Sequence, residues 1–250
     1  MSQSDSAENR TARERLWAEQ ERQQNSRKRY RTLKVAGAMI AVLSLVGVGG
    51  FVAANQDAGG GGDAAEAKPI AQGDPKGQGA ATLTIYEDFR CPACKQFEEG
   101  FRDTIEQLRR DGKLRTEYHL VTIIDDNMGG NGSTYAANAA ACAQDEGRFQ
   151  EYHDLLFSKQ PAEQDDAYGD KGRLLDLAGQ VEGLDSARFR ACVEKGEHAS
   201  WVERSNDAFL KSGHNATPTV LLDGENIYAD QDEPLTPEKL RELVEEKAKA

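Results

Sequence analysis

The sequence predicts an α/β fold in which a long helical block divides a small β-sheet, with a single transmembrane helix ahead of it. Short β-rich runs at 83–90, 114–124 and 219–228 flank a stretch of about 90 residues with helical periodicity. A run of 20 residues without a charged side chain, 35–54, stands before the first strand. A helical block of this length excludes a doubly wound sheet of repeating strand–helix units. We expect one folded domain at 81–250.

Charge is divided unevenly along the chain. Residues 1–34 hold nine Lys or Arg and five Asp or Glu, whereas the remaining 216 residues hold 22 basic and 38 acidic side chains. The net charge of −12 therefore combines a basic head with an acidic body. An acidic body argues against nucleic-acid binding, which needs a cationic surface for the phosphates. A hydrophobic content of 38% is sufficient for a globular core.

The uncharged run at 35–54 matches the thickness of a membrane. At about 1.5 Å per residue, a helix of this length crosses a hydrocarbon core of about 30 Å. Five basic residues lie just before it: Arg27, Lys28, Arg29, Arg31 and Lys34. This flank predicts a single-pass protein of the cell membrane with a cytoplasmic N-terminus and an extracytoplasmic catalytic domain. Cleavage as a signal peptide at 52–54 is the alternative, and the body is exported in both cases.

The segments on either side of the anchor are expected to lack a fold of their own. Residues 1–34 form a basic cytoplasmic segment whose charge sets the membrane topology. Residues 55–80 contain four consecutive glycines, several alanines and two prolines, a composition typical of a flexible linker. The folded domain is therefore predicted to begin at residue 81.

A dithiol lies where the first predicted strand gives way to a helix. The strand run is followed directly by Cys91-Pro92-Ala93-Cys94. Residues at three- and four-residue spacing then form one helix stripe: Cys94, Phe97, Phe101, Ile105 and Leu108. Pro92 fits the first helical turn, where its missing N–H costs nothing. We expect Cys94 in the buried face and Cys91 at the helix start, outside that face.

The two thiols are expected to differ in reactivity. Unpaired N–H groups and the positive end of the helix dipole favour a thiolate at Cys91, and Arg90 and Lys95 are expected to add positive charge. We therefore predict that Cys91 is the nucleophile and Cys94 the resolving thiol. Half of a zinc site and an inert disulfide are the alternatives. Zinc needs four ligands and the sequence has no second C-x-x-C motif, so no metal is expected.

Two carboxylates, Glu87 and Asp88, stand just before the dithiol. Carboxylates that face a thiol oppose its ionisation. We expect both to be solvated charges at the strand end, and a proton relay to Cys94 is the alternative.

The remaining elements follow from periodicity and turn signals. A partly alternating run at 114–124 predicts a second strand. Five helices are expected in the following block, at 134–146, 148–158, 171–181, 186–195 and 199–212. Asp185 is a candidate N-cap and Gly213 a candidate C-terminal stop. Strand character returns at 219–222, Asp223-Gly224 predicts a tight hairpin turn, and a last helix begins at Thr236-Pro237.

The motif Phe89-Arg90-Cys91-Pro92-Ala93-Cys94 resembles the F-x-C-P-x-C site of exported DsbA-like thiol–disulfide oxidoreductases, in particular membrane-tethered actinobacterial members. That family has a thioredoxin fold with an inserted helical domain, which the block at about 125–214 matches. It also has a cis-proline opposite the dithiol, matched here by Asn-Ala-Thr-Pro-Thr-Val at 215–220. The resemblance, which covers about 85–245, implies that Pro218 is cis and that the Thr217 backbone binds an extended substrate.

The dipeptide between the cysteines departs from the best-known form of the family. Pro92 and Ala93 are expected to modulate the dithiol, but the strongest oxidants carry His where this chain has Ala93. Without an imidazole donor, we expect less stabilisation of a thiolate at Cys91.

A second cysteine pair lies in the helical block. Cys142 stands among alanines on a close-packed helix face, and Cys192 follows Phe189 by three residues on another inner face. In an oxidising compartment such a pair predicts a structural disulfide, worth about 4 kcal/mol by loop closure. Free buried thiols and a redox relay are the alternatives.

Motif and resemblance together predict an exported, membrane-tethered dithiol oxidase that acts on thiols of unfolded secreted proteins. The resemblance implies reoxidation by a membrane redox partner of the DsbB or VKOR type, without a cofactor in this chain, and a monomer is the default. A reductase or isomerase with the same cysteines, and a non-catalytic peptide-binding module, are the alternatives. His214 lies either at the edge of the active-site groove or elsewhere on the surface.

Overall fold

The computed structural model describes residues 67–73, 80–229 and 233–247. The expected transmembrane run at 35–54 and the basic segment at 1–34 lie outside these residues. Within the described residues, no helix combines the length and the apolar character that crossing a membrane requires.

The described strands form one mixed sheet in the order β1-β3-β2-β4-β5. Strand β2 pairs in parallel with β3 and antiparallel with β4, while β1 and β5 pair antiparallel at the two edges. The strands are β1 Ile70–Gln72, β2 Ala81–Glu87, β3 Leu114–Leu120, β4 Thr219–Leu222 and β5 Glu225–Asn226. The predicted strand order along the chain is therefore confirmed from β2 onward.

Strand β1 corrects the expected domain boundary. Residues 70–72 were expected in the linker at 55–80, but they pair with 116–118 of β3. The short run Ile70-Ala71-Gln72 lies between glycine- and alanine-rich stretches and gives too little alternation to be recognised as a strand. Strand β1 pairs with the free edge of β3, and that edge exists only once the tertiary fold has formed. The neighbouring sequence therefore does not signal the pairing.

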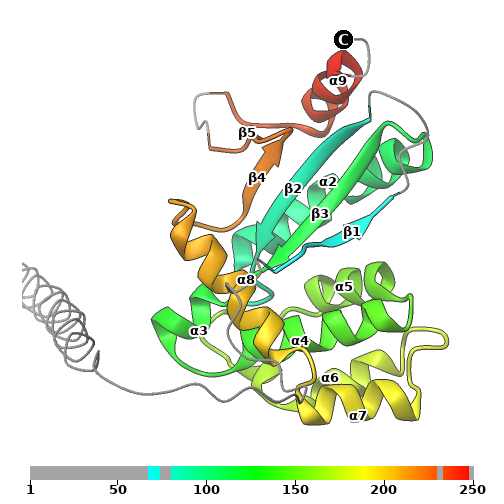
Figure 1. The fold of residues 1–250 in the computed structure, drawn as a ribbon, viewed down its shortest axis with the longest axis vertical. Helices are drawn as coiled ribbons and strands as arrows, with labels where there is room; N and C mark the ends of the chain where they lie inside the picture. The colour runs from blue at the N-terminus through cyan, green and yellow to red at the C-terminus, as the bar shows by residue number, and fades with distance from the viewer. Residues whose placement is uncertain (1–66, 74–79, 230–232, 248–250) are drawn as a thin grey trace, which may run out of the picture. The chain divides into compact units, whose positions relative to one another are not determined.

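The predicted helix after β2 and the predicted last helix are confirmed, as is the long helical block between β3 and β4. Figure 1 shows α4 to α7 gathered beyond one end of the sheet. The helices are α2 Pro92–Arg110, α3 Ile123–Met128, α4 Gly132–Asp145, α5 Phe149–Ser158, the 3-10 turn η1 Ala167–Gly169, α6 Lys171–Ala178, α7 Ala187–Lys195, α8 Ala199–Lys211 and α9 Pro237–Lys247.

Helices α2 and α8 cover opposite faces of the sheet. Leu83 and Ile85 of β2 are fully buried and share one face, because side chains alternate along a strand. Tyr86 points to the other face, where it stacks on His119 of β3 and contacts Phe209 of α8. Helix α2 packs against β3, α5 and α9. Its N-terminus therefore sits beside the helical block.

The predicted strand at 114–124 is too long. Strand β3 ends at Leu120, and Ile123 begins α3. Residues 121–124, Val-Thr-Ile-Ile, are all β-branched, which favours a strand locally. However, Asp125 and Asp126 stand in the first turn of α3, where they suit the positive end of the helix dipole, and Asp88 accepts a hydrogen bond from the Ile124 N–H (3.0 Å).

The predicted helix stop and hairpin turn are confirmed, and one predicted N-cap lies a residue later than expected. Ser186, not Asp185, is the N-cap of α7 and accepts from the Phe189 N–H. Gly213 follows α8 with a φ of +87°, as a helix stop requires. At the hairpin turn, Asp223 and Gly224 have φ of 49° and 87°, values typical of a type I′ turn.

Candidate functional site

The dithiol lies at the first turn of α2. Cys91 is the N-cap residue, Pro92 opens the helix, and Pro92 and Ala93 are exposed. Neither Cys91 nor Cys94 is in a disulfide, so the structure holds the site as a dithiol. Cys94 is fully buried, as its place in the helix stripe predicts.

Cys91 is more enclosed than the sequence suggests. We expected it outside the packed face, but only 6% of its surface is exposed. The loop before β4 lies against it, and its thiol donates to the carbonyl oxygen of Thr217 at 3.3 Å. The Thr217–Pro218 peptide bond is cis. A loop 126 residues away in the sequence therefore forms one wall of the dithiol site.

The environment separates the pKa values of the two thiols. A hydrogen bond from the Cys94 thiol is the largest influence on Cys91; with the Thr217 hydroxyl and the N–H groups of Cys94 and Ala93, it lowers the Cys91 pKa to about 6. Burial opposes this shift. Burial also raises the pKa of Cys94 well above its usual range, and the negative charges of Cys91 and Glu87 raise it further. At neutral pH the site therefore holds a thiolate at Cys91 and a thiol at Cys94.

Two cationic side chains expected beside the thiols are engaged elsewhere. Arg90 is 2% exposed and forms an ion pair with Asp125, at 2.7 Å, and with Asp166, at 3.1 Å. Lys95 donates to the Ser158 carbonyl at 3.3 Å and pairs with Glu99 at 3.6 Å. The Cys91 thiolate is thus stabilised by neutral donors and helix N–H groups, and Arg90 instead fastens the dithiol loop to the helical block.

Glu87 and Asp88 are buried, which overturns the expectation of solvated charges. Both have 0% exposure. Asp88 accepts from the N–H groups of Arg90 (2.8 Å) and Ile124 (3.0 Å), and burial raises its pKa to about 7. The carboxylate of Glu87 lies 2.7 Å from Nε2 of His153 on α5. These acids therefore join the dithiol strand to the helical block.

A buried charge cluster stands behind Cys94. Burial alone would lower the pKa of His153, but Glu87 and Glu98 raise it to about 10. Glu98 is 1% exposed, and burial together with the charge of Glu87 raises its pKa well above the usual range. With a pKa of about 10, His153 is protonated at neutral pH beside the Glu87 carboxyl, and Glu98 holds its proton more strongly than an exposed glutamate does.

Sequence reasoning did not single out Glu98 or His153. Glu98 lies four residues after Cys94, on the same buried stripe, and His153 lies four residues after the buried Phe149. A polar residue in phase with an apolar helix face is the signal that would have identified both.

Two groups of ligand-type side chains lie close together in the described part of the chain. The ligand atoms of Glu87, Glu98 and His153 all lie within 4.8 Å of one another, but the raised pKa of His153 favours the imidazolium, which has no lone pair to offer a metal. The other group is Cys142, Cys192 and His198. Its two sulfur atoms are joined in a disulfide, which does not offer the thiolates that a metal prefers.

The second cysteine pair links two helices of the block. Cys142 on α4 and Cys192 on α7 form a disulfide with an S–S distance of 2.06 Å and a Cα–Cα distance of 6.0 Å. It crosslinks residues 50 apart in the sequence.

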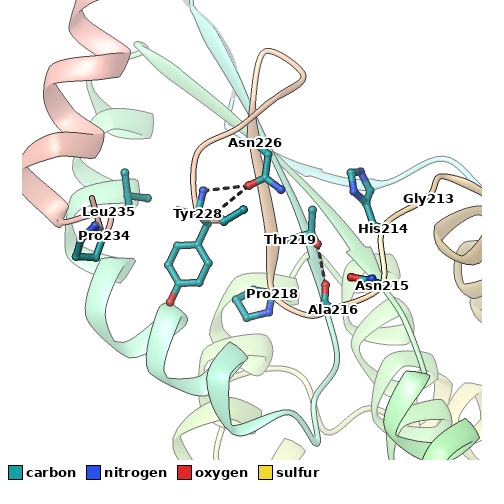
Figure 2. A pocket seen from close by; sticks show the side chains of 11 residues that line it. Gly213, His214, Asn215, Ala216, Pro218, Thr219, Asn226, Tyr228, Pro234 and Leu235 are labelled. Atoms are coloured by element: carbon teal, nitrogen blue, oxygen red, sulfur yellow. Dashed lines mark hydrogen bonds between the residues drawn. The ribbon is translucent and has the colours of Figure 1, made fainter. Parts of the chain in front are cut away.

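A cavity of about 650 Å³ opens beside Pro218. Figure 2 shows Tyr228 reaching from the hairpin into this space with its hydroxyl toward the start of α2, and His214 on the wall at the far side of Pro218. The ring of Tyr228 also meets Phe97 edge-on, with centroids 5.2 Å apart. The cavity is lined by residues of the loop before β4, the hairpin and the segment before α9: Gly213, His214, Asn215, Ala216, Pro218, Thr219, Asn226, Tyr228, Ala229, Pro234 and Leu235. His214 therefore lies at the edge of the groove, one of its two expected places.

A helix that begins at a C-x-x-C dithiol, faced by a cis-proline loop on a mixed sheet, defines a thioredoxin-type redox protein. The family model described as thioredoxin matches residues 66–246, and the chain belongs to that family. Disulfide bond formation protein D of Bacillus subtilis is 29% identical over 198 residues, which cover 76% of this chain and 83% of that protein.

Comparison with solved structures identifies the group of thioredoxin-type proteins to which this chain is similar. Oxidised DsbA of Mycobacterium tuberculosis is 33% identical, with a TM-score of 0.59 over 68% of this chain and 84% of that chain. Oxidised BdbD of Bacillus subtilis is 25% identical, with a TM-score of 0.59 over 76% of this chain and all of that chain (100%). The protein is therefore a DsbA-like thiol:disulfide oxidoreductase.

Proposed function

We propose that the protein is an exported dithiol oxidase that introduces disulfides into unfolded secreted proteins through Cys91 and Cys94. The observation that carries this proposal is the separation of the two thiols: Cys91 has a pKa of about 6, whereas Cys94 is buried with a raised pKa. A stabilised thiolate favours the reduced form of the enzyme, so the matching disulfide is a good oxidant.

The reaction transfers two electrons from substrate to enzyme. A substrate thiolate attacks Sγ of Cys91 in the enzyme disulfide, a mixed disulfide forms, and Cys94 leaves as a thiolate. A second substrate thiolate then attacks the substrate sulfur of the mixed disulfide. The substrate disulfide forms, and Cys91 leaves as a thiolate, which its low pKa makes a good leaving group.

The buried Cys94 needs a proton when it is released. Its thiolate is strongly disfavoured by burial and by the charge of Glu87. The raised pKa of Glu98 favours its protonated form, and Glu98 adjoins Glu87, so this carboxyl pair is the proposed proton source. The alternative weighed for Glu87, proton relay, is therefore part of the proposal.

The substrate is proposed to lie along the loop before β4. The Thr217 backbone borders the Cys91 sulfur, and the cavity beside Pro218 offers both apolar and polar walls. An extended chain can add to this loop by backbone hydrogen bonds, which suits many sequences because side chains contribute little. Unfolded proteins supply such chains, and the acidic body is not suited to nucleic acid.

The uncharged run at 35–54 supports a single-pass anchor in the cell membrane, with the N-terminus cytoplasmic and the catalytic domain extracytoplasmic. On that surface, a monomer would meet a membrane redox partner of the DsbB or VKOR type, which reoxidises the dithiol. Protease treatment of intact cells tests this topology. The proposal requires that the domain is cleaved from outside and that deletion of 35–54 leaves it unattached to membranes.

Oxidation of a reduced, unfolded secreted protein tests the catalytic proposal. The oxidised enzyme is expected to give up its Cys91–Cys94 disulfide as substrate disulfides form, and Cys91→Ser is expected to abolish the transfer. Cys94→Ser cannot form the enzyme disulfide and is expected to lose the transfer too. When it is mixed with substrate that already carries disulfides, its Cys91 thiolate is expected to open one of them and, without a resolving thiol, to stay in a mixed disulfide that mass spectrometry can locate. An enzyme that instead reduces substrate disulfides at the same glutathione ratio would contradict the oxidase and favour the reductase.

A further inference from the structure

The segment that runs from the last residue of α5 to η1 contacts the dithiol segment, residues 89–95, at three points. This clasp segment, residues 158–166, accepts a hydrogen bond from Lys95 at the Ser158 carbonyl (3.3 Å) and from Arg90 at the Glu163 carbonyl (3.0 Å). Between these contacts, the side-chain amide of Gln160 donates to two backbone carbonyls, those of Phe89 and Cys91, each at 2.9 Å. The helical block thus holds the backbone on both sides of the reactive cysteine.

We propose that Gln160 is a positioning residue that keeps Cys91 in its reactive geometry. The inference rests on the proposed role of Cys91 as the reacting thiol. A primary amide has two N–H donors, and here both are used on backbone carbonyls of the dithiol segment, those of Phe89 and Cys91. Those two bonds fix the Phe89–Arg90 and Cys91–Pro92 peptide planes, which enclose Arg90 and Cys91, and so restrict the direction of the Cys91 side chain.

Gln160 is itself firmly held. Its N–H donates to the carbonyl of Phe157 at the end of α5 (3.2 Å), and Pro161 restricts it to an extended conformation. The Phe157 ring in turn packs on Phe89, with centroids 4.8 Å apart. The amide therefore reaches the dithiol loop from a rigid base, as a positioning group requires.

The Gln160 contact acts on the same carbonyl that starts α2. Cys91 O accepts from the Lys95 N–H at 3.2 Å as the first acceptor of the helix. The second bond, from Gln160, holds this carbonyl in line with the helix, so the sulfur stays near the N–H groups of Ala93 and Cys94 that stabilise its thiolate. Without the amide, the carbonyl of the N-cap residue Cys91 loses this side-chain hydrogen bond.

Titration of the reduced full-length protein, followed by the ultraviolet absorbance of its thiolate, tests this role. Gln160→Ala is expected to raise the Cys91 pKa by about half a unit, roughly threefold less thiolate at a pH below it. Gln160→Glu keeps the shape but replaces donors with a negative charge, so a rise of about one unit is expected. Gln160→Asn keeps the amide but is one methylene too short, and it should behave like the alanine variant.

Gln164 provides the matched control. It lies on the clasp segment, is exposed, and makes no hydrogen bond within the described residues. Gln164→Ala and Gln164→Glu are expected to leave the Cys91 pKa unchanged. Equal pKa values in the Gln160 and Gln164 series would overturn the proposal. A Gln160 variant with a lower melting temperature but an unchanged pKa would also overturn it, since that outcome describes a structural contact alone.

The thiolate titration needs no substrate, so the two proposals fail separately. If the parent enzyme does not oxidise substrates but Gln160 variants still shift the Cys91 pKa, positioning stands and the oxidase falls. If the parent enzyme oxidises substrates while the Gln160 variants titrate as the parent does, the oxidase stands and positioning falls.

Discussion

The thiol of Cys91 lies 3.3 Å from the carbonyl oxygen of Thr217. A thiol can donate to this oxygen, but a thiolate cannot, and two electron-rich atoms would then face each other. The Thr217 hydroxyl is buried and has no hydrogen-bond partner of regular geometry among the described residues. It is therefore free to turn toward the sulfur when the thiol ionises, and its influence lowers the Cys91 pKa.

Thr217→Val removes this hydroxyl while keeping the shape of the side chain. We expect the Cys91 pKa to rise from about 6, by roughly half a unit to one unit. The pH dependence of alkylation by iodoacetamide measures it. Thr84→Val, in the middle of β2, is the control and should leave the alkylation profile unchanged. An unchanged profile in Thr217→Val would mean that the hydroxyl does not act on the sulfur.

The stability of the reduced protein should depend on the ionisation of Cys91. Its pKa is about 6 in the folded protein against an ordinary 9.0. A lowered pKa stabilises the fold fully above the ordinary value, and this gain is lost as the pH falls through about 6. Urea unfolding of the reduced protein should therefore show a rise in stability between about pH 6 and pH 9 that reduced Cys91→Ser lacks. Parallel profiles for both proteins would contradict the lowered pKa.

His153→Leu should be strongly destabilising. It leaves the fully buried Glu87 carboxylate without its cation, and breaking a buried pair from one side costs about 3–5 kcal/mol. His198→Leu is the control, because the His198–Asp145 pair is partly exposed and is worth about 0–1 kcal/mol. Urea unfolding of the two variants separates them. Equal losses would mean that the buried pair contributes no more than the exposed one.

His153 should also make the stability depend on pH, in the direction opposite to Cys91. The folded-state pKa of His153 is raised from 6.5 to about 10. A raised pKa contributes stability that is complete below 6.5 and is lost as the pH rises through about 10. The difference in stability between the parent and His153→Leu should therefore shrink across this range. A constant difference would contradict a charged His153.

Replacing the second cysteine pair should cost stability but spare the chemistry. Cys142→Ser with Cys192→Ser opens a closed loop of 50 residues, a loss of about 4 kcal/mol by the chain-entropy model. The oxidation of substrate and the Cys91 pKa are expected to stay as in the parent, because the crosslink joins α4 and α7 rather than the dithiol loop. A variant with a normal melting temperature but no oxidase activity would instead assign the pair to a redox relay.

Sequence periodicity predicted the parts of the fold that are set by nearby residues. The α2 stripe, the hairpin turn at Asp223-Gly224 and the Thr236 cap each depend on residues within one or two turns. The burial of Glu87 was not predictable in this way, because its partner, His153, lies 66 residues away on the helical block. From the neighbouring sequence alone, two acidic residues at a strand end are expected to be solvated. Their burial depends on a helix that is distant in the sequence.

The same limit applies to the dithiol. The position of Cys94 on the apolar stripe predicted its burial, since periodicity reports the buried face directly. The flanking cation was a poor guide, because Arg90 turns toward Asp125, 35 residues on. Ala93 offers no imidazole, but Cys94 and the Thr217 hydroxyl lower the Cys91 pKa in its place.

The reduction potential of the Cys91–Cys94 pair, equilibrated against glutathione with Cys142–Cys192 followed separately by mass spectrometry, tests the central proposal most directly. The oxidase proposal, which rests on the lowered Cys91 pKa, predicts a value closer to the roughly −120 mV of strong exported oxidants than to that of thioredoxin. A value near the roughly −270 mV of thioredoxin would contradict the oxidase and assign the protein to reduction.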